Sequence, residues 1–184
     1  FGRRAHPGDG LSLGGGLVRN DIDTWFRDEG SELSLNGLYL LHGQQHCDNH
    51  TFIDHAKPNC TSREVFKGIL DGKSQGIFYG MILVQKDAQK TNARQTNRNL
   101  LLSKEAFADS TPGLEILADD VKCAHGSTVG QLDENAIFYL RTRGIDEDTA
   151  RAMLTYAFAS EIINSVKVAS MRIKLDQLVL SRLP

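Results

Sequence analysis

The stretch LEILADDVKCAHGSTVGQLDENAIFYL, residues 114–140, marks a change in the pattern of the sequence. From Leu114 to Asp119 every second residue is apolar, which is the period of a strand whose alternate side chains share one face. From Leu132 onward the apolar residues recur at helical spacing. Strands are therefore predicted to end within this stretch, and helices are predicted to follow it.

The residues before this stretch, from Val18 to about Val121, predict a mainly β structure. Short runs of Val, Ile, Leu, Phe and Tyr are separated by Gly, Asn, Asp and Pro at intervals of about ten residues, and helical periodicity is absent. The runs that predict strands are LVRND, LSLNGLYLLHG, HTFIDHA, VFKGIL, GIFYGMILVQ, NLLLS and LEILA.

A weak internal repeat favours a β-solenoid over a sandwich or a barrel. Gly37–Leu41 is similar to Gly80–Val84, which lies 43 positions later, and each is followed by a polar segment and a second short strand. Half of that offset, about 21 to 22 residues, is a plausible length for one coil of a solenoid, in which stacked coils bury a continuous core. The sequence therefore predicts coils of about this length.

After Gly130 the sequence predicts two or three helices. The first begins near Leu132 and ends at Gly144, because glycine adopts the left-handed backbone that terminates many helices. Asp146 is a good N-cap for a second helix, and residues 168–178 repeat the helical pattern. We expect a β domain over residues 1–130 and a helical domain over residues 131–184. The second helix carries an apolar stripe that either packs on its own domain or binds a partner; its residues are Ala150, Met153, Leu154, Ala157, Phe158 and Ile162.

The composition argues against several classes of protein. The chain has 184 residues and a formal net charge of −2, with scattered basic residues, so it offers no electrostatic surface for nucleic acid or an anionic membrane. No apolar run could span a bilayer, and no secretory signal is visible. The three cysteines form no disulfide framework, which indicates a reducing compartment such as the cytoplasm. Because the chain begins with Phe1 and enters glycine-rich turns at once, we expect a fragment of a longer protein.

Polar segments between the predicted strands hold most of the candidate metal ligands. His46, Asp48 and His50 alternate and would share one face of a strand, which indicates either a metal-binding face or a solvent-facing ladder between coils. No spacing here matches a closed zinc site. The run QKTNARQTNRN, residues 89–99, is predicted to be an exposed coil rather than a nucleic-acid patch, since it has no aromatic side chain. The full ligand-like set is His42, His46, Cys47, Asp48, His50, Asp54, His55 and Cys60.

Cys123 and His125, within the opening stretch, form a second candidate site. On an extended backbone the two side chains point to the same face, so one metal ion could reach both. A structural zinc site needs four ligands, and the two residues of a nucleophilic Cys-His pair normally come from distant positions. The remaining interpretation is a simple turn in which Gly126 adopts positive φ and Cys123 is buried.

Four motifs together resemble the SufB/SufD family of the SUF iron–sulfur cluster assembly machinery. They are NGLYL (36–40), DHAKPNCTSREVFKGILDG (54–72), QKTNARQTNRNLLLS (89–103) and ADDVKCAHGSTVGQLDENAIFYLRTRGI (118–145). The resemblance implies a right-handed parallel β-helix followed by a small C-terminal α-helical domain. This agrees with the solenoid and the helices predicted from the sequence pattern.

The same resemblance implies the function and the partners of the chain. It implies a non-enzymatic scaffold that pairs with a SufB-like paralogue through the β-helix and docks a SufC-like ATPase through the helices, over about residues 132–163. It also implies that His125, with Cys123 beside it, binds iron or a nascent iron–sulfur cluster shared with the partner chain. The location would be the cytoplasm, or the plastid stroma in a plant or alga. A fragment cut from such a solenoid exposes strand edges, so we expect it to self-associate.

Two alternative functions remain open from the sequence. The first is a carbohydrate-active β-helix lyase or hydrolase, although the paired carboxylates are few and aromatic residues make up only 7% of the chain. The second is a purely structural subunit in which Cys123 and His125 bind nothing and the partner supplies every cluster ligand.

Overall fold

The computed structural model describes residues 5–183, with side chains from residue 8 onward. Within this range the chain forms nine strands and then three helices. The strands are β1 Ala5–Ser12, β2 Leu17–Phe26, β3 Glu32–Leu41, β4 His46–His55, β5 Thr61–Leu70, β6 Gln75–Val84, β7 Asn92–Leu101, β8 Phe107–Ile116 and β9 Lys122–Gly130. The helices are α1 Glu134–Thr142, α2 Glu147–Ser165 and α3 Ala169–Leu180.

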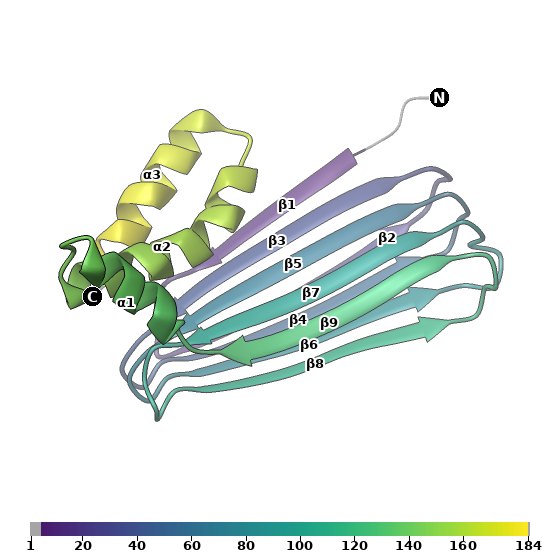
Figure 1. Ribbon diagram of the computed structural model, residues 1–184. Helices are drawn as coiled ribbons and strands as arrows, with labels where there is room; N and C mark the ends of the chain where they lie inside the picture. Colours follow the sequence, from purple (N-terminus) through teal and green to yellow (C-terminus); the bar gives the residue numbers. More distant parts are fainter. Residues whose placement is uncertain (1–4, 184) are drawn as a thin grey trace.

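The strands form a parallel β-solenoid of about four coils. The first sheet has the order β1-β3-β5-β7-β9 and the second has the order β2-β4-β6-β8, and every neighbouring pair is parallel. In Figure 1 the chain runs leftward along the first sheet and rightward along the second while it advances downward, which is a right-handed coil. The predicted β-helix followed by helices is confirmed.

The coils are longer than the internal repeat predicts. Gly37 in β3 pairs with Phe66, which lies 29 positions later in the chain, and Gln75 pairs with Phe107, 32 positions later. Gly80 belongs to β6 in the second sheet, so the similar segments that begin at Gly37 and Gly80 lie on opposite sides of the solenoid. The predicted coil of about 21 to 22 residues is wrong, because the offset of 43 residues spans about one and a half coils.

The predicted exposed coil at residues 89–99 is also wrong over most of its length. Residues 92–101 form β7, a strand with neighbours on both sides. Its alternate residues Ala93, Gln95, Asn97 and Asn99 point inward and are buried. The amides remain inside because they bond to each other and to neighbouring groups; Asn99 Nδ2, for example, donates to Asn97 Oδ1 at 2.7 Å.

The main core lies between the two sheets. Alternate residues of each central strand point inward, as in β4, where every second residue is buried. The largest fully buried apolar side chains here are Tyr39, Phe78, Ile53, Leu70 and Ile82. This packing makes the interior a continuous column that runs through all the coils.

The helices pack on the outer face of the first sheet. Asp133 caps α1, and Asp146 caps α2 by accepting from the Thr149 backbone N–H, as the sequence predicts for Asp146. The predicted apolar stripe of α2 is divided in the structure, because Ala150 and Ile162 are buried whereas Met153 is 47% exposed. The buried face instead forms a second core with the outer residues of the sheet: Leu38, Leu40, Val65, Ile69, Leu100, Ala159, Ile162 and Ile163.

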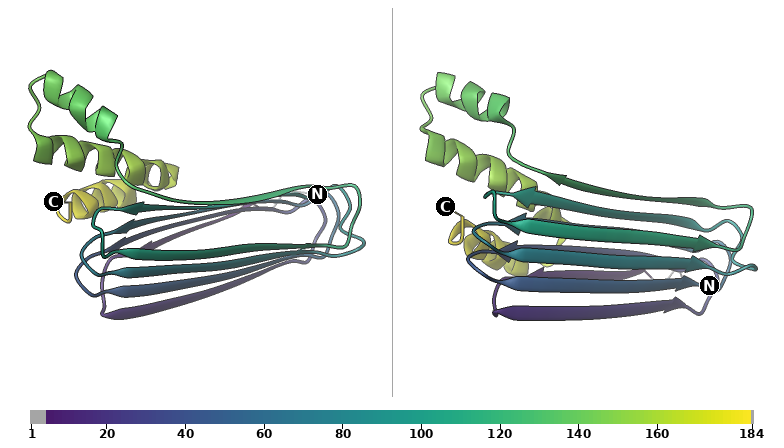
Figure 2. Two further views of the ribbon diagram at one scale, coloured as in Figure 1. Left: turned by 60° about the horizontal axis from the view of Figure 1, so that its bottom comes forward. Right: turned by 90° about the horizontal axis from the view of Figure 1, so that it is seen from below.

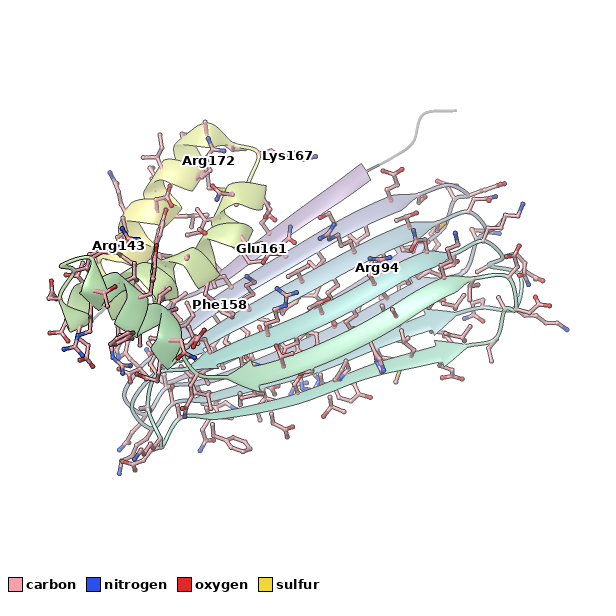
Figure 3. The ribbon with its side chains drawn as sticks, in the orientation of Figure 1. Arg94, Arg143, Phe158, Glu161, Lys167 and Arg172 are labelled. Carbon is pink, nitrogen blue, oxygen red and sulfur yellow. The ribbon has the colours of Figure 1, made fainter. Side chains whose placement is uncertain are left out.

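Lys67 of β5 joins the sheet to α2. Its side chain is almost completely buried, and Nζ lies 2.9 Å from the Phe158 carbonyl oxygen and 2.6 Å from Glu161 Oε2. The ammonium also lies 4.5 Å from the centre of the Phe158 ring. Figure 3 labels Phe158 and Glu161 where α2 approaches the sheet. Lys67 thus gives the helices a fixed, charge-assisted contact with the solenoid.

Lys67→Met is expected to lower the free energy of unfolding by about 2 kcal/mol, the usual value of a hydrogen bond from a buried charged donor. Methionine keeps most of the buried volume, so the loss reflects the polar contacts. Urea unfolding measures it. The control is Lys73→Met, which removes an ion pair with Glu105 whose two side chains are 63% and 65% exposed. Equal effects of the two variants would contradict this role for Lys67.

Candidate functional site

The solenoid has an open end at its last coil. After β9 the chain leaves for α1, so within the described residues no further coil covers the inward side chains of β8 and β9. The left-hand view of Figure 2, in which the bottom of Figure 1 is turned forward, looks toward this end. We define the open end by these inward residues, which continue the buried columns of β6 and β7: Ala108, Ser110, Pro112, Leu114, Ile116, Cys123, His125, Ser127 and Val129.

Cys123 and His125 both point inward from β9. Cys123 pairs with Ala93 and His125 with Gln95, and both of these partners face the interior. Cys123 is half-buried and packs against the main core, and this burial raises the pKa of its thiol. His125 is exposed. The two side chains therefore share one face, and they stand in a strand rather than in a turn.

These two residues are too few for a closed metal site. Among the described residues, no group of three or more His, Cys, Asp and Glu side chains could hold a metal ion. A zinc or iron site of four ligands would need further donors from another chain. The open end thus offers a thiol and an imidazole, two side-chain types that ligate metal ions, on one face of β9.

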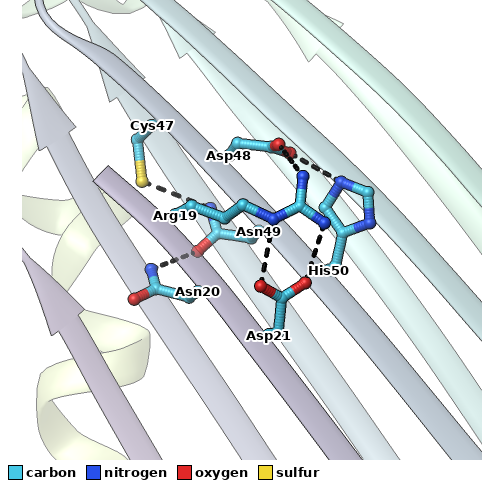
Figure 4. A network of polar contacts seen from close by, with 7 residues as sticks. All are labelled: Arg19, Asn20, Asp21, Cys47, Asp48, Asn49 and His50. Carbon is cyan, nitrogen blue, oxygen red and sulfur yellow. Dashed lines mark hydrogen bonds and ion pairs between the residues drawn. The ribbon is translucent and has the colours of Figure 1, made fainter. Parts of the chain in front are cut away.

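The ligand-like set around β4 is divided between the two faces of the strand. Asp48 accepts from Arg19, which also bonds Asp21, and His50 Nε2 lies 2.9 Å from Asp48 Oδ1 (Figure 4). His50 also stacks on Tyr79 of the next coil, with ring centres 5.3 Å apart. The outer residues form a polar ladder between coils, which is one of the two interpretations that the sequence leaves open.

The inward members of the same set do not join that ladder. Cys47, Cys60 and His55 are fully buried, and His55 Nε2 bonds to the Ser62 hydroxyl at 2.8 Å. Burial lowers the pKa of His55 to about 4. The alternation of the strand therefore separates residues that are neighbours in the sequence, and the described structure brings no metal face together here.

A pair of buried polar residues beneath His125, Gln95 and Glu64, was not predicted from the sequence. Gln95 is 1% exposed and its Nε2 donates to Glu64 Oε2 at 2.7 Å; Glu64 is fully buried. Burial raises the pKa of the Glu64 carboxyl, and the hydrogen bond from Gln95 opposes that shift. The sequence did contain one indication of this strand. Amide residues alternate with Arg94 and Arg98 along β7, and such alternation is typical of a strand even when the residues are polar.

The helices present a second candidate surface. Asp148, Thr149, Met153, Tyr156, Leu180 and Leu183 are among the residues that line a hollow of about 340 Å³ between α2 and α3. Several large apolar side chains are exposed on the helices: Phe138 at 68%, Tyr139 at 57%, Met171 at 55% and Ile173 at 57%. Such exposed apolar residues on one small unit are typical of a protein-binding surface.

Within the described part of the chain, no helix combines the length and the hydrophobicity that a membrane span requires.

Comparison with known proteins finds the same family over most of the chain. Residues 9–158 match the model of the SufBD core domain of the SUF system for FeS cluster assembly. The iron–sulfur cluster assembly protein SufD of Escherichia coli is 41% identical over 172 residues, which cover 94% of this chain and 41% of that protein. A SufBD family protein of Synechocystis is 39% identical over 94% of this chain and 38% of its own length. The chloroplastic protein ABCI7 of Arabidopsis thaliana is 38% identical over 154 residues, which cover 83% of this chain and 32% of that protein.

Proposed function

This chain belongs to the SufBD family of the SUF iron–sulfur cluster assembly system, and we propose that it acts there as a non-enzymatic scaffold that supplies half of a cluster-binding site. The membership confirms the family that its motifs predict. The chain spans about two fifths of the length of its E. coli and Synechocystis relatives, so the activity and partners of the whole protein are part of the proposal. The observation that carries it is the placement of Cys123 and His125 together at the open end.

The proposed partner at the open end is a SufB-like paralogue. Exposed apolar groups such as Val129, at 48%, and Ile116, at 40%, need a cover that excludes water. β8 and β9 are also the last strands of their sheets, and their free edges can pair with strands of another chain. A second β-helix satisfies both requirements, since it presents the same kind of strand edge and the same interior column.

The proposed ligands are His125 and, beside it, Cys123. Iron and a nascent iron–sulfur cluster are cargo in this system, and thiolates and imidazoles are their protein ligands. The raised pKa of Cys123 favours the thiol over the thiolate in the uncovered chain, so metal binding at this residue must displace a proton. His125 is exposed, so a metal ion can reach its ring directly, which supports it as the leading ligand.

The proposed docking surface for a SufC-like ATPase lies on the helices. The exposed apolar residues of α1, Phe138 and Tyr139, lie within the region, residues 132–163, that the family resemblance assigns to this contact. A hollow between α2 and α3 adds a place where a partner side chain can insert. Because Lys67 ties α2 to the first sheet, movement of a docked ATPase would be transmitted to the solenoid.

His125→Ala is expected to abolish cluster formation by the complex with its SufB-like and SufC-like partners, because it removes the exposed imidazole at the open end. Anaerobic reconstitution with ferrous iron and sulfide, followed by absorbance spectroscopy, measures the loss, and gel filtration checks that the complex still assembles. The control is His42→Ala, which changes an exposed histidine in the turn after β3. Undiminished cluster formation by His125→Ala would instead favour the structural role in which the partner supplies every ligand.

The carbohydrate-active enzyme gains no support from the family match, which is to cluster assembly proteins. We propose the cytoplasm as the location, or the plastid stroma in a plant or alga, because the relatives come from bacteria and include a chloroplastic protein. Self-association of the isolated chain is a further proposal, which sedimentation at tens of micromolar would test; a monodisperse monomer would contradict it.

A further inference from the structure

One column of inward-facing side chains leads through the first sheet to the open end. Leu35, Glu64, Gln95 and His125 are successive partners in β3, β5, β7 and β9. The first three are buried, and His125 ends the column at the surface. The column is apolar at Leu35 and polar from Glu64 onward, and Glu64 lies two coils before His125, the proposed iron ligand.

The hydrogen bond between Gln95 and Glu64 fixes the direction of the Gln95 amide. Glu64 Oε2 accepts from Gln95 Nε2, so the amide oxygen, Oε1, is left for another donor. Gly80 on the opposite sheet leaves room for this arrangement, because a Cβ there would overlap Gln95 Nε2. The amide nitrogen of Gln95 thus lies between Glu64 and Gly80.

Gln95 Oε1 has no hydrogen-bond partner within the described residues although it is buried. A buried acceptor without a partner is unfavourable, so a donor that reaches it is favoured. The next side chain in the column is His125, whose ring carries an N–H in either neutral tautomer. Thr51, another interior donor, lies beside Glu64 in an earlier coil.

We propose that Gln95 positions the His125 ring when a partner covers the open end: Gln95 Oε1 accepts a hydrogen bond from one ring N–H, and the other ring nitrogen then presents its lone pair to the iron. Glu64 supports this contact by holding the amide of Gln95. The inference rests on the proposed function, because it concerns how His125 binds its cargo. Gln95 acts through His125 and is a positioning residue, not a ligand.

Such a contact has a clear chemical effect. A histidine binds metal through a neutral ring nitrogen, and the hydrogen bond at the other nitrogen selects the tautomer and the ring orientation. Loss of a supporting residue of this kind typically weakens metal binding 10- to 100-fold. The polar interior of β7 therefore places a rigid acceptor beneath an otherwise exposed ring.

The test uses the full-length protein in complex with its SufB-like and SufC-like partners. Solid-state NMR of a ¹⁵N-histidine-labelled chain, without iron, identifies the His125 ring signals by their absence from His125→Ala. A single tautomer is expected in the wild type, and a tautomer mixture in Gln95→Met, which has similar length but no acceptor. Ferrous iron titration should show binding about 10- to 100-fold weaker in Gln95→Met.

Two further variants separate positioning from structure. Glu64→Gln combined with Gln95→Glu exchanges the two groups and keeps an oxygen toward His125, so the single tautomer should return. Thr51→Val removes an interior hydroxyl beside Glu64 and should leave the His125 signals unchanged. An unchanged His125 spectrum in Gln95→Met, or a failure of the exchanged pair to restore the tautomer, would overturn the inference. If His125→Ala bound iron normally, the ligand assignment itself would fail, which is a separate result.

Discussion

Gly68→Ala is expected to lower the free energy of unfolding by about 3 kcal/mol, because the interior has no space for a methyl group at this position. Gly68 of β5 lies between Tyr39 and Asn99 in neighbouring coils. A Cβ there would overlap the Tyr39 ring and the Asn99 side-chain oxygen, both of which are buried. It would also separate the Tyr39 hydroxyl from Asn99, to which that hydroxyl donates a hydrogen bond. Urea unfolding of the purified protein measures the change.

A matched glycine on the same sheet provides the control for Gly68. Gly126 of β9 has ordinary negative φ and open space around its Cβ position. Gly126→Ala should therefore have little effect on stability, or raise it slightly by restricting the unfolded chain. If both alanine variants lost the same free energy, strand propensity rather than interior packing would explain the cost at Gly68.

The order of strands and helices was predictable because local patterns determine it. Short apolar runs marked the strands from β2 to β6 and the ends of β7 and β8, and the caps at Asp146 and Gly144 marked the helix boundaries. The coil length was not predictable from one repeat, because strands on opposite sheets share the same inward alternation. Only the strand register decides the coil length: Gly37 pairs with Phe66, 29 positions later, so the offset of 43 residues spans about one and a half coils.

The candidate site was predictable only in part, for a similar reason. Alternation placed Cys123 and His125 on one face, but their position at the open end depends on where the last coil stops. Glu64 and Gln95 were missed because polar residues in a sequence normally indicate an exposed segment. In this interior one hydrogen bond joins them, and that pairing is visible only in three dimensions.

A loss of stability at acidic pH is expected from His55, which is fully buried against Phe26. Burial lowers the pKa of His55 to about 4, compared with about 6.5 in an unfolded chain. The unfolded state therefore binds more protons between these values, so this contribution is present above about pH 6.5 and is lost as the pH falls toward about 4. The shift corresponds to about 3 kcal/mol. Urea unfolding between pH 7 and pH 4 measures it.

The contribution of His55 to the pH dependence of stability is obtained by comparing variants, because the contribution of Glu64 has the opposite sign. The raised pKa of Glu64 makes its contribution fall as the pH rises from the unfolded value, about 4.3. Between pH 7 and pH 4, the free energy of unfolding of His55→Leu should therefore fall by about 3 kcal/mol less than that of the wild type. Ser62→Ala, which removes the hydrogen-bond partner of His55 Nε2 but keeps the ring buried, should retain most of the wild-type pH dependence. If Ser62→Ala abolished that dependence instead, the hydrogen bond and not burial would be its cause.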